Sequence, residues 1–307
     1  MMASGPARRR ETARTRAIAV GLALGLSLEL AAAISAADES APRPDAADAV
    51  ERGHYVLYAA GCIACHTAED ENAKPLAGGR ALKTDFGTFR PPNITPDSET
   101  GIGGWTEEQF AQALTRGLSP SGDPLYPAFP YTSYAGMRKE DVSDLFAYLR
   151  SIEPVHNEVP DHDLKFPYSI RSGLRVWQKL YFDPKPFMPD ASKPDAWNRG
   201  AYLVNHESHC GECHTPRNFL GAMQEDKRLM GGKGAEGDKI PNITRGKGGI
   251  SNWSKNALLE FLKTGFLPNG DVVGGSMYDV IMDSTSHLTD ADREAIATYL
   301  MDLPAAD

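Results

Sequence analysis

The pentapeptide Cys-x-x-Cys-His occurs twice, at residues 62–66 (CIACH) and at residues 210–214 (CGECH). This motif is typical of haem c attachment, in which two thiols form thioethers with the porphyrin and the adjacent imidazole ligates the iron. A zinc site would need two further Cys or His ligands near each pair, and a redox dithiol does not need the trailing His. All four cysteines of the chain lie inside the two motifs, so none remains for a disulfide. The sequence therefore predicts two covalently bound haem c groups, attached and ligated by Cys62, Cys65, His66, Cys210, Cys213 and His214.

The segments around the two motifs also match one another, which indicates an internal repeat. The matching pairs are Arg-Gly-x-Tyr at 52–55 and 199–202, Pro-Asn-Ile-Thr at 92–95 and 241–244, and Tyr-Leu at 148–149 and 299–300. Their offset grows only from 147 to 151 residues along the copy. Each copy is long enough for a small domain whose core is completed by its cofactor.

The repeat predicts two domains, residues 47–153 (the first copy) and residues 198–304 (the second copy). Residues 154–197 connect them and contain seven prolines, so this segment is expected to pack as a strap rather than to act as a flexible tether. No stretch alternates strictly between polar and apolar residues, which favours an all-α fold. Helices are expected at residues 47–60, 106–117, 139–151, 170–182 and 254–265, with Gly53 allowing a second helix to cross closely.

The first 36 residues have the pattern of an export signal. Five arginines precede an apolar stretch at residues 17–30, and small residues follow at 31–37. An uncleaved membrane anchor is the alternative, although Glu29 would be costly inside a bilayer. Cleavage after Ala36 would remove five Arg and two Glu, changing the net charge from −9 to −12. An acidic protein of this kind is not expected to bind nucleic acid or an anionic membrane surface.

The chain resembles the cytochrome c subunits of bacterial periplasmic dehydrogenases, such as those acting on alcohols, aldehydes and gluconate. Besides the pentapeptides, the resemblance rests on Asn-Ile-Thr, on Gly-x-Gly-x-Trp ending at Trp105, on Leu-Tyr-Pro-Ala-Phe-Pro-Tyr at 125–131 and on Ala-Tyr-Leu-Arg at 147–150. It implies two tandem class I cytochrome c domains in the periplasm that transfer electrons and do no bond chemistry. The implied partners are a dehydrogenase catalytic subunit or other redox protein, with a quinone or a terminal oxidase as candidate acceptor.

The resemblance also implies a methionine thioether as the sixth iron ligand, which raises the haem potential. In the second copy Met277 is favoured over Met282. In the first copy Phe129 occupies the expected methionine position and cannot ligate iron, so Met137 is only a tentative ligand. An open site or a histidine, His156 or His162, remains the alternative. An open first haem would suit a peroxidase-like haem enzyme or a small-ligand sensor, although no distal acid–base pair and no output domain are evident.

Other residues are expected to support the haems. The carbonyl groups of Pro75 and Pro216 are the nearest candidates to hold the second nitrogen of each proximal histidine. Amide and indole groups that could donate to haem propionates are Asn93, Asn242, Trp105 and Trp253, although either Trp could equally fill the core. The remaining histidines, His54, His206, His209 and His287, are expected to be surface or supporting residues.

Overall fold

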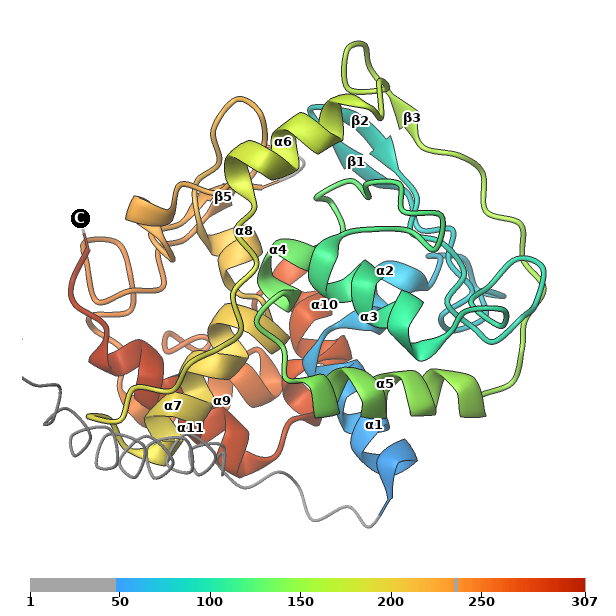
Figure 1. Cartoon of the computed structure of the whole chain (residues 1–307). Helices are drawn as coiled ribbons and strands as arrows, with labels where there is room; N and C mark the ends of the chain where they lie inside the picture. Colours follow the sequence, from blue (N-terminus) through green and yellow to red (C-terminus); the bar gives the residue numbers. More distant parts are fainter. Residues whose placement is uncertain (1–47, 235–236, 307) are drawn as a thin grey trace, which may run out of the picture. The chain divides into compact units, whose positions relative to one another are not determined.

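Two pairs of helices, one in each copy, cross at a glycine. The computed structural model describes residues 48–234 and 237–306. In the first copy α1 (Ala49–Ala59) crosses α5 (Lys139–Ser151), and in the second copy α7 (Asp195–Tyr202) packs on α11 (Asp290–Asp302) (Figure 1). A Cβ atom on Gly53 would collide with the Asp144 carbonyl on α5, and one on Gly200 with the Ala295 carbonyl on α11. The close crossing expected at Gly53 is therefore confirmed, and the repeat has the same crossing.

Local signals in the sequence define the next helix of each copy. Thr106 and Gln109 form the expected capping box at the start of α3 (Glu107–Arg116), which ends at Gly117 in the left-handed conformation. In the second copy Ser254 caps α9 (Lys255–Thr264), which ends at Gly265 in the same conformation. The remaining α-helices are α2 (Cys62–His66), α4 (Tyr131–Tyr134), α6 (Gly173–Tyr181), α8 (Gly211–His214) and α10 (Ser276–Asp283), with short 3-10 turns η2 (Glu225–Lys227) and η3 (Thr285–His287).

Strands make only a small part of the described residues, as the absence of alternation predicted. β1 (Leu82–Thr84), β2 (Gly87–Phe89) and β3 (Asp163–Leu164) form one antiparallel sheet. β4 (Gly232–Lys233) and β5 (Lys239–Ile240) form a second, two-stranded one. β3 comes from the connecting segment, so the first sheet joins that segment to the first copy.

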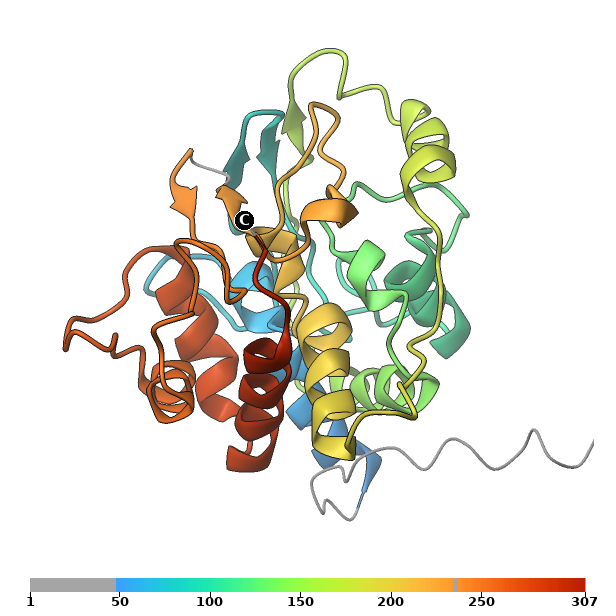
Figure 2. The ribbon, with the colours of Figure 1, turned by 90° about the vertical axis from the view of Figure 1, so that its left-hand side faces the viewer.

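Each helix pair has its own apolar core, and the two cores belong to one compact unit. The first core contains Leu57, Leu145 and Leu149, and the second contains Leu203 and Ile296. The two helix pairs lie next to each other, with α1 close to the second copy (Figure 2).

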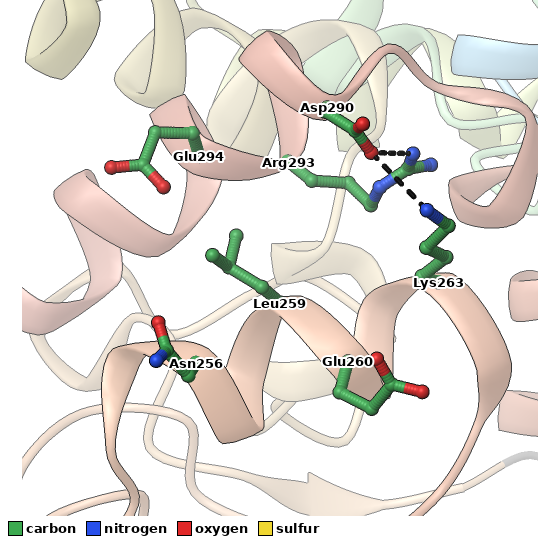
Figure 3. Close-up of a pocket in the computed structure, with 7 residues that line it drawn as sticks. All are labelled: Asn256, Leu259, Glu260, Lys263, Asp290, Arg293 and Glu294. Atoms are coloured by element: carbon green, nitrogen blue, oxygen red, sulfur yellow. Dashed lines mark hydrogen bonds and ion pairs between the residues drawn. The ribbon is translucent and has the colours of Figure 1, made fainter.

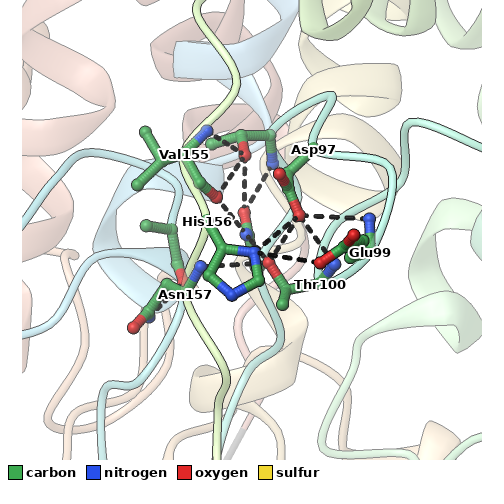
Figure 4. A network of polar contacts seen from close by, with 9 residues as sticks. Asp97, Glu99, Thr100, Val155, His156 and Asn157 are labelled. Atoms are coloured by element: carbon green, nitrogen blue, oxygen red, sulfur yellow. Dashed lines mark hydrogen bonds and ion pairs between the residues drawn. The ribbon is translucent and has the colours of Figure 1, made fainter.

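The connecting segment packs against both copies. At its start the Val155 carbonyl accepts hydrogen bonds from Asn93 Nδ2 at 2.7 Å and Thr95 Oγ1 at 3.3 Å, in the network of Figure 4. Further along, Trp177 Nε1 on α6 donates to the Leu220 carbonyl of the second copy at 2.9 Å. The expected helix at 170–182 corresponds to α6. α7 begins at Asp195, three residues before the expected boundary at residue 198, which stays a prediction.

A one-residue insertion explains why the repeat offset changes from 147 to 148. Arg52 precedes Cys62 by ten residues, whereas Arg199 precedes Cys210 by eleven. The extra residue is absorbed where α7 continues into the π-helical turn η1 (Leu203–Glu207). Single-turn π-bulges inside α-helices are rare and often lie at functional sites.

The expected export signal, residues 1–36, lies outside the described residues. Within residues 48–234 and 237–306, no helix has both the length and the apolar character required to cross a membrane.

Candidate functional site

Each pentapeptide forms a single helical turn, α2 in the first copy and α8 with its preceding Cys210 in the second. The four cysteines are free of disulfides. Burial raises the pKa of Cys62 and of Cys210 to about 12, so before attachment both are thiols. A redox dithiol needs a cysteine with a lowered pKa to supply the thiolate nucleophile, so the raised pKa of these cysteines argues against a redox dithiol site.

The two proximal histidines are held in the same way. His66 Nδ1 lies 2.7 Å from the Pro92 carbonyl, and His214 Nδ1 lies 2.8 Å from the Pro241 carbonyl. A carbonyl oxygen only accepts, so Nδ1 must carry the proton and the lone pair of the neutral ring is on Nε2. Burial also lowers the pKa of both imidazoles, which favours the neutral form that ligates iron. Each side chain is therefore ready to offer Nε2 to a metal.

These contacts correct the expectation that Pro75 and Pro216 would be the acceptors. The chain does not use the loop directly after the motif, because the later Pro-Asn-Ile-Thr loop folds back over the imidazole. The sequence carried a signal for this loop, because Pro-Asn-Ile-Thr is repeated in both copies at nearly the same distance from the motif. Pro92 follows His66 by 26 residues, and Pro241 follows His214 by 27 residues.

The asparagines of that loop hold the loop itself. Asn93 Nδ2 donates to Thr100 Oγ1 and to the Val155 carbonyl, so both of its amide hydrogens are engaged within the protein. Asn242 Nδ2 donates to the Ala306 carbonyl at 3.0 Å. Asn93 therefore has no amide hydrogen left for a propionate, and propionate donation from the Asn242 loop stays a prediction.

The tryptophans proposed as propionate donors lie against the cores. Trp105 packs on the first core cluster and Trp253 on the second, and both side chains are partly buried. This placement fits the core-filling alternative, and donation to a propionate stays a prediction.

The candidate sixth ligands occupy unlike surroundings. Met137 is only 5% exposed and belongs to the first core cluster, which Cys62 and Phe129 border. Met277 is partly buried at the start of α10. Of the histidine alternatives, His156 faces Asp97 and Glu99 at the surface (Figure 4), and His162 Nδ1 accepts from the Arg90 amide.

The two copies meet through reciprocal tyrosine contacts. Tyr55 Oη donates to Asp292 at 2.6 Å and accepts from the Thr289 amide at 3.1 Å. Its repeat equivalent, Tyr202, donates to Asp141 at 2.6 Å, and its hydroxyl accepts from the Arg138 amide at 3.1 Å. Self-complementary pairs of this kind are the mark of a two-fold interface, which here lies inside one chain.

Each pentapeptide is also connected to the other copy, the second one directly and the first one through Arg80. Thr132 Oγ1 and Ser133 Oγ on α4 donate to Glu212 of the second motif at 2.7 and 2.6 Å. In the opposite direction, Arg80 bridges the Ala64 carbonyl of the first motif, at 2.5 Å, and Asp279 on α10, at 2.9 Å. α4, which follows Phe129, and α10, which contains Met277, therefore help to fix the attachment turn of the neighbouring copy.

A buried charge cluster distinguishes the second copy from the first. Arg199 donates through Nε and Nη2 to Asp292, at 2.9 and 2.6 Å, and through Nη1 to Glu207 at 3.1 Å. All three side chains are at most 6% exposed. In the first copy Arg52 pairs instead with Asp144, three residues after Asp141, which is the repeat equivalent of Asp292, and Ala59 stands where the second copy has Glu207. Desolvation raises the pKa of Glu207 to about 8, although Arg199 opposes the shift.

This shift predicts that stability falls with rising pH. Between the ordinary carboxyl pKa and about 8, the folded protein holds a proton on Glu207 that the unfolded chain releases. The free energy of unfolding should therefore fall by up to about 1.4 kcal/mol per pH unit. Thermal unfolding from pH 7.5 to 9 tests this, because the buried histidines have lowered pKa values and in that range are neutral in both the folded and the unfolded chain. Glu207→Gln should flatten the profile. An equally steep profile in that variant would contradict the assignment.

A surface hollow lies away from the pentapeptides. It has a volume of about 310 Å³ between α9 and α11 and is lined partly by Lys263, Asp290 and Arg293 (Figure 3). Asp290 pairs with Arg293 at 2.6 Å and with Lys263 at 3.5 Å, so these charges satisfy one another. In addition, no three His, Cys, Asp or Glu side chains converge as a metal-ion site anywhere in residues 48–234 and 237–306. The candidate site is therefore the pair of attachment turns.

The donor set fits covalent haem. Each turn presents two unpaired thiols next to an imidazole whose Nδ1 is fixed and whose Nε2 is available. Fold and site together define a helical haem c-binding protein.

Comparison with known proteins leads to the same class. Residues 50–153 match the cytochrome c family. A diheme cytochrome c-type protein of Cereibacter sphaeroides is 45% identical over 260 residues, covering 83% of this chain and 86% of the relative. The chain belongs to this cytochrome c family, and is an electron-transfer protein rather than a catalytic subunit.

Cytochrome subunits of dehydrogenases are also similar. The fructose dehydrogenase cytochrome subunit of Gluconobacter japonicus is 42% identical over 269 residues, covering 87% of this chain and 54% of the relative. The cytochrome c subunit of a quinone alcohol dehydrogenase from Gluconacetobacter polyoxogenes is 39% identical over 276 residues, covering 86% of this chain and 58% of the relative. The chain thus spans little more than half the length of these subunits.

Proposed function

We propose that this protein is a diheme cytochrome that carries electrons between a dehydrogenase catalytic subunit, or another redox donor, and a quinone or terminal acceptor. One haem c would be attached in each copy, so that the chain comprises two tandem class I cytochrome c domains joined by a proline-rich strap. The observation that carries the proposal is the equivalence of the two attachment turns, each with its Nδ1–carbonyl contact.

The chain's own residues supply what an electron carrier needs. The cysteines fix the position of each haem covalently, and the Pro92 and Pro241 carbonyls fix the tautomer and orientation of the proximal imidazoles. The bound haem supplies the one-electron chemistry. We assign Met277 as sixth ligand in the second copy and Met137 as tentative sixth ligand in the first, where its apolar surroundings would favour a thioether over water.

The relatives support the assignment of a dehydrogenase as partner. Several are cytochrome subunits of enzymes named for fructose, gluconate or alcohol oxidation. The basic and apolar features of residues 1–36 and the extracytoplasmic attachment of haem c support export to the periplasm. The haem-enzyme and sensor alternatives gain no support from these relatives.

Haem stoichiometry tests the proposal directly. After co-expression with a haem c maturation system, the pyridine haemochrome should give two haems per chain. Cys210→Ser with Cys213→Ser should leave one haem, and the equivalent change at Cys62 and Cys65 should leave the other. A single haem in the unaltered protein would refute the diheme proposal.

A further inference from the structure

The two attachment turns are connected by a contact between the residues that precede them. His209, the residue before Cys210, places Nε2 at 3.2 Å from the carbonyl oxygen of Ala60, two residues before Cys62. Because that oxygen only accepts, the His209 Nε2 must carry the proton and donate. Tyr134 Oη donates to the same oxygen at 2.8 Å, and its ring meets the His209 ring edge-on at 5.3 Å between centroids.

The backbone at this position indicates that the histidine side chain serves a purpose. Gly61 and His209 occupy equivalent places, one residue before the first cysteine, and both have left-handed backbone, with φ of 63° and 39°. Glycine adopts this conformation freely, whereas another L-residue there is strained. The second copy therefore keeps a strained residue where the first has the unstrained one. The contact across the copies accounts for the difference.

The surroundings hold this contact rigidly. Tyr134 is only 5% exposed and its hydroxyl is bonded. On the same short helix, Thr132 and Ser133 donate to Glu212 inside the second motif. α4 therefore braces both attachment turns at once, through Ala60 on one side and Glu212 on the other.

We propose that the His209–Ala60 hydrogen bond, braced by Tyr134, is the electronic connection between the two haem sites. From Cys62 the route follows the backbone to the Ala60 carbonyl, crosses one hydrogen bond to the imidazole, and continues along the backbone to Cys210. Electronic coupling decays less along covalent and hydrogen bonds than across gaps. One iron loses an electron and the other gains it, and no bond or proton needs to change. The inference rests on the proposed function, since both sites must carry haem.

The test removes the bridge and keeps the fold. His209→Gly installs the residue found in the first copy and relieves the backbone strain, so folding should persist. Tyr134→Phe keeps the ring and removes only the hydroxyl. His54→Gln is the matched control, because His54 is an exposed histidine of the first copy stacked on Tyr148 and away from the contact.

The holoproteins are reduced by a laser-generated flavin semiquinone, and electron redistribution between the haems is followed by absorbance. His209→Gly should slow redistribution several-fold, with haem content and both reduction potentials unchanged. Tyr134→Phe should slow it less, and His54→Gln should not. Unchanged rates in His209→Gly with both haems present would overturn the bridge while leaving the diheme carrier intact. Failure of the proposed function would instead show in the unaltered protein, as a missing haem or no redistribution phase.

Discussion

Replacing Arg199 with methionine should destabilise the folded protein by about 3–5 kcal/mol, because the buried Asp292 carboxylate then loses the guanidinium group that pairs with it. Arg199 is 6% exposed and is shared by Asp292, at 5%, and Glu207, at 1%. Methionine fills similar space, so the loss reports the missing charge more than a cavity. Urea unfolding of the holoprotein measures the effect as a shift in the midpoint.

Arg52→Met is the control, since Arg52 is the repeat equivalent of Arg199 and pairs with a different acid, Asp144, in the first copy. Its side chain is 30% exposed, so water screens the pair, and the expected loss is about 1 kcal/mol. Adding Glu207→Gln to Arg199→Met should change the stability little at neutral pH, because the raised pKa of Glu207 keeps it protonated there and Asp292 is then the carboxylate left unpaired. Equal losses in the two single variants would show that burial of the cluster has no energetic consequence.

The sequence predicted those parts of the fold that depend on short-range signals. Thr106 with Gln109 and the glycine at 117 defined α3, and the apolar spacing in residues 139–151 defined α5, at the bounds that the structure has. Gly53 indicated the crossing of α1 and α5 because a glycine inside a helix needs a packing reason. The attachment residues followed from motif chemistry alone.

Contacts that join distant segments could not be read in the same way. The Pro92 and Pro241 carbonyls are backbone atoms, and their role depends on how a loop folds back rather than on any side chain. Glu207 reaches Arg199 only because a single insertion becomes a π-turn. His209 was expected to be a surface or supporting residue, since nothing in its sequence neighbourhood indicates that the other copy lies within hydrogen-bond distance.

Met277→Ala should remove the methionine–iron charge-transfer band of one haem and lower the reduction potential of that haem. A thioether stabilises the ferrous state relative to water or a vacant site, so both changes follow if Met277 ligates the second iron. If both haems have methionine ligands, the band should fall to about half its intensity. Absorbance spectroscopy of the ferric protein and a redox titration measure the two quantities.

Met282→Ala is the control, because Met282 is a partly buried methionine on the same helix, α10. It should leave the band and both potentials in place and cost only packing energy. If Met282→Ala removes the band and Met277→Ala does not, the assignment of the two methionines must be exchanged.

Met137→Ala completes the comparison. If Met137 ligates the first iron, this variant should remove the remaining band, whereas an unchanged spectrum would leave the first iron with another ligand or with an open position. The two distal sites would then differ even though their proximal sides share the same imidazole–carbonyl contact.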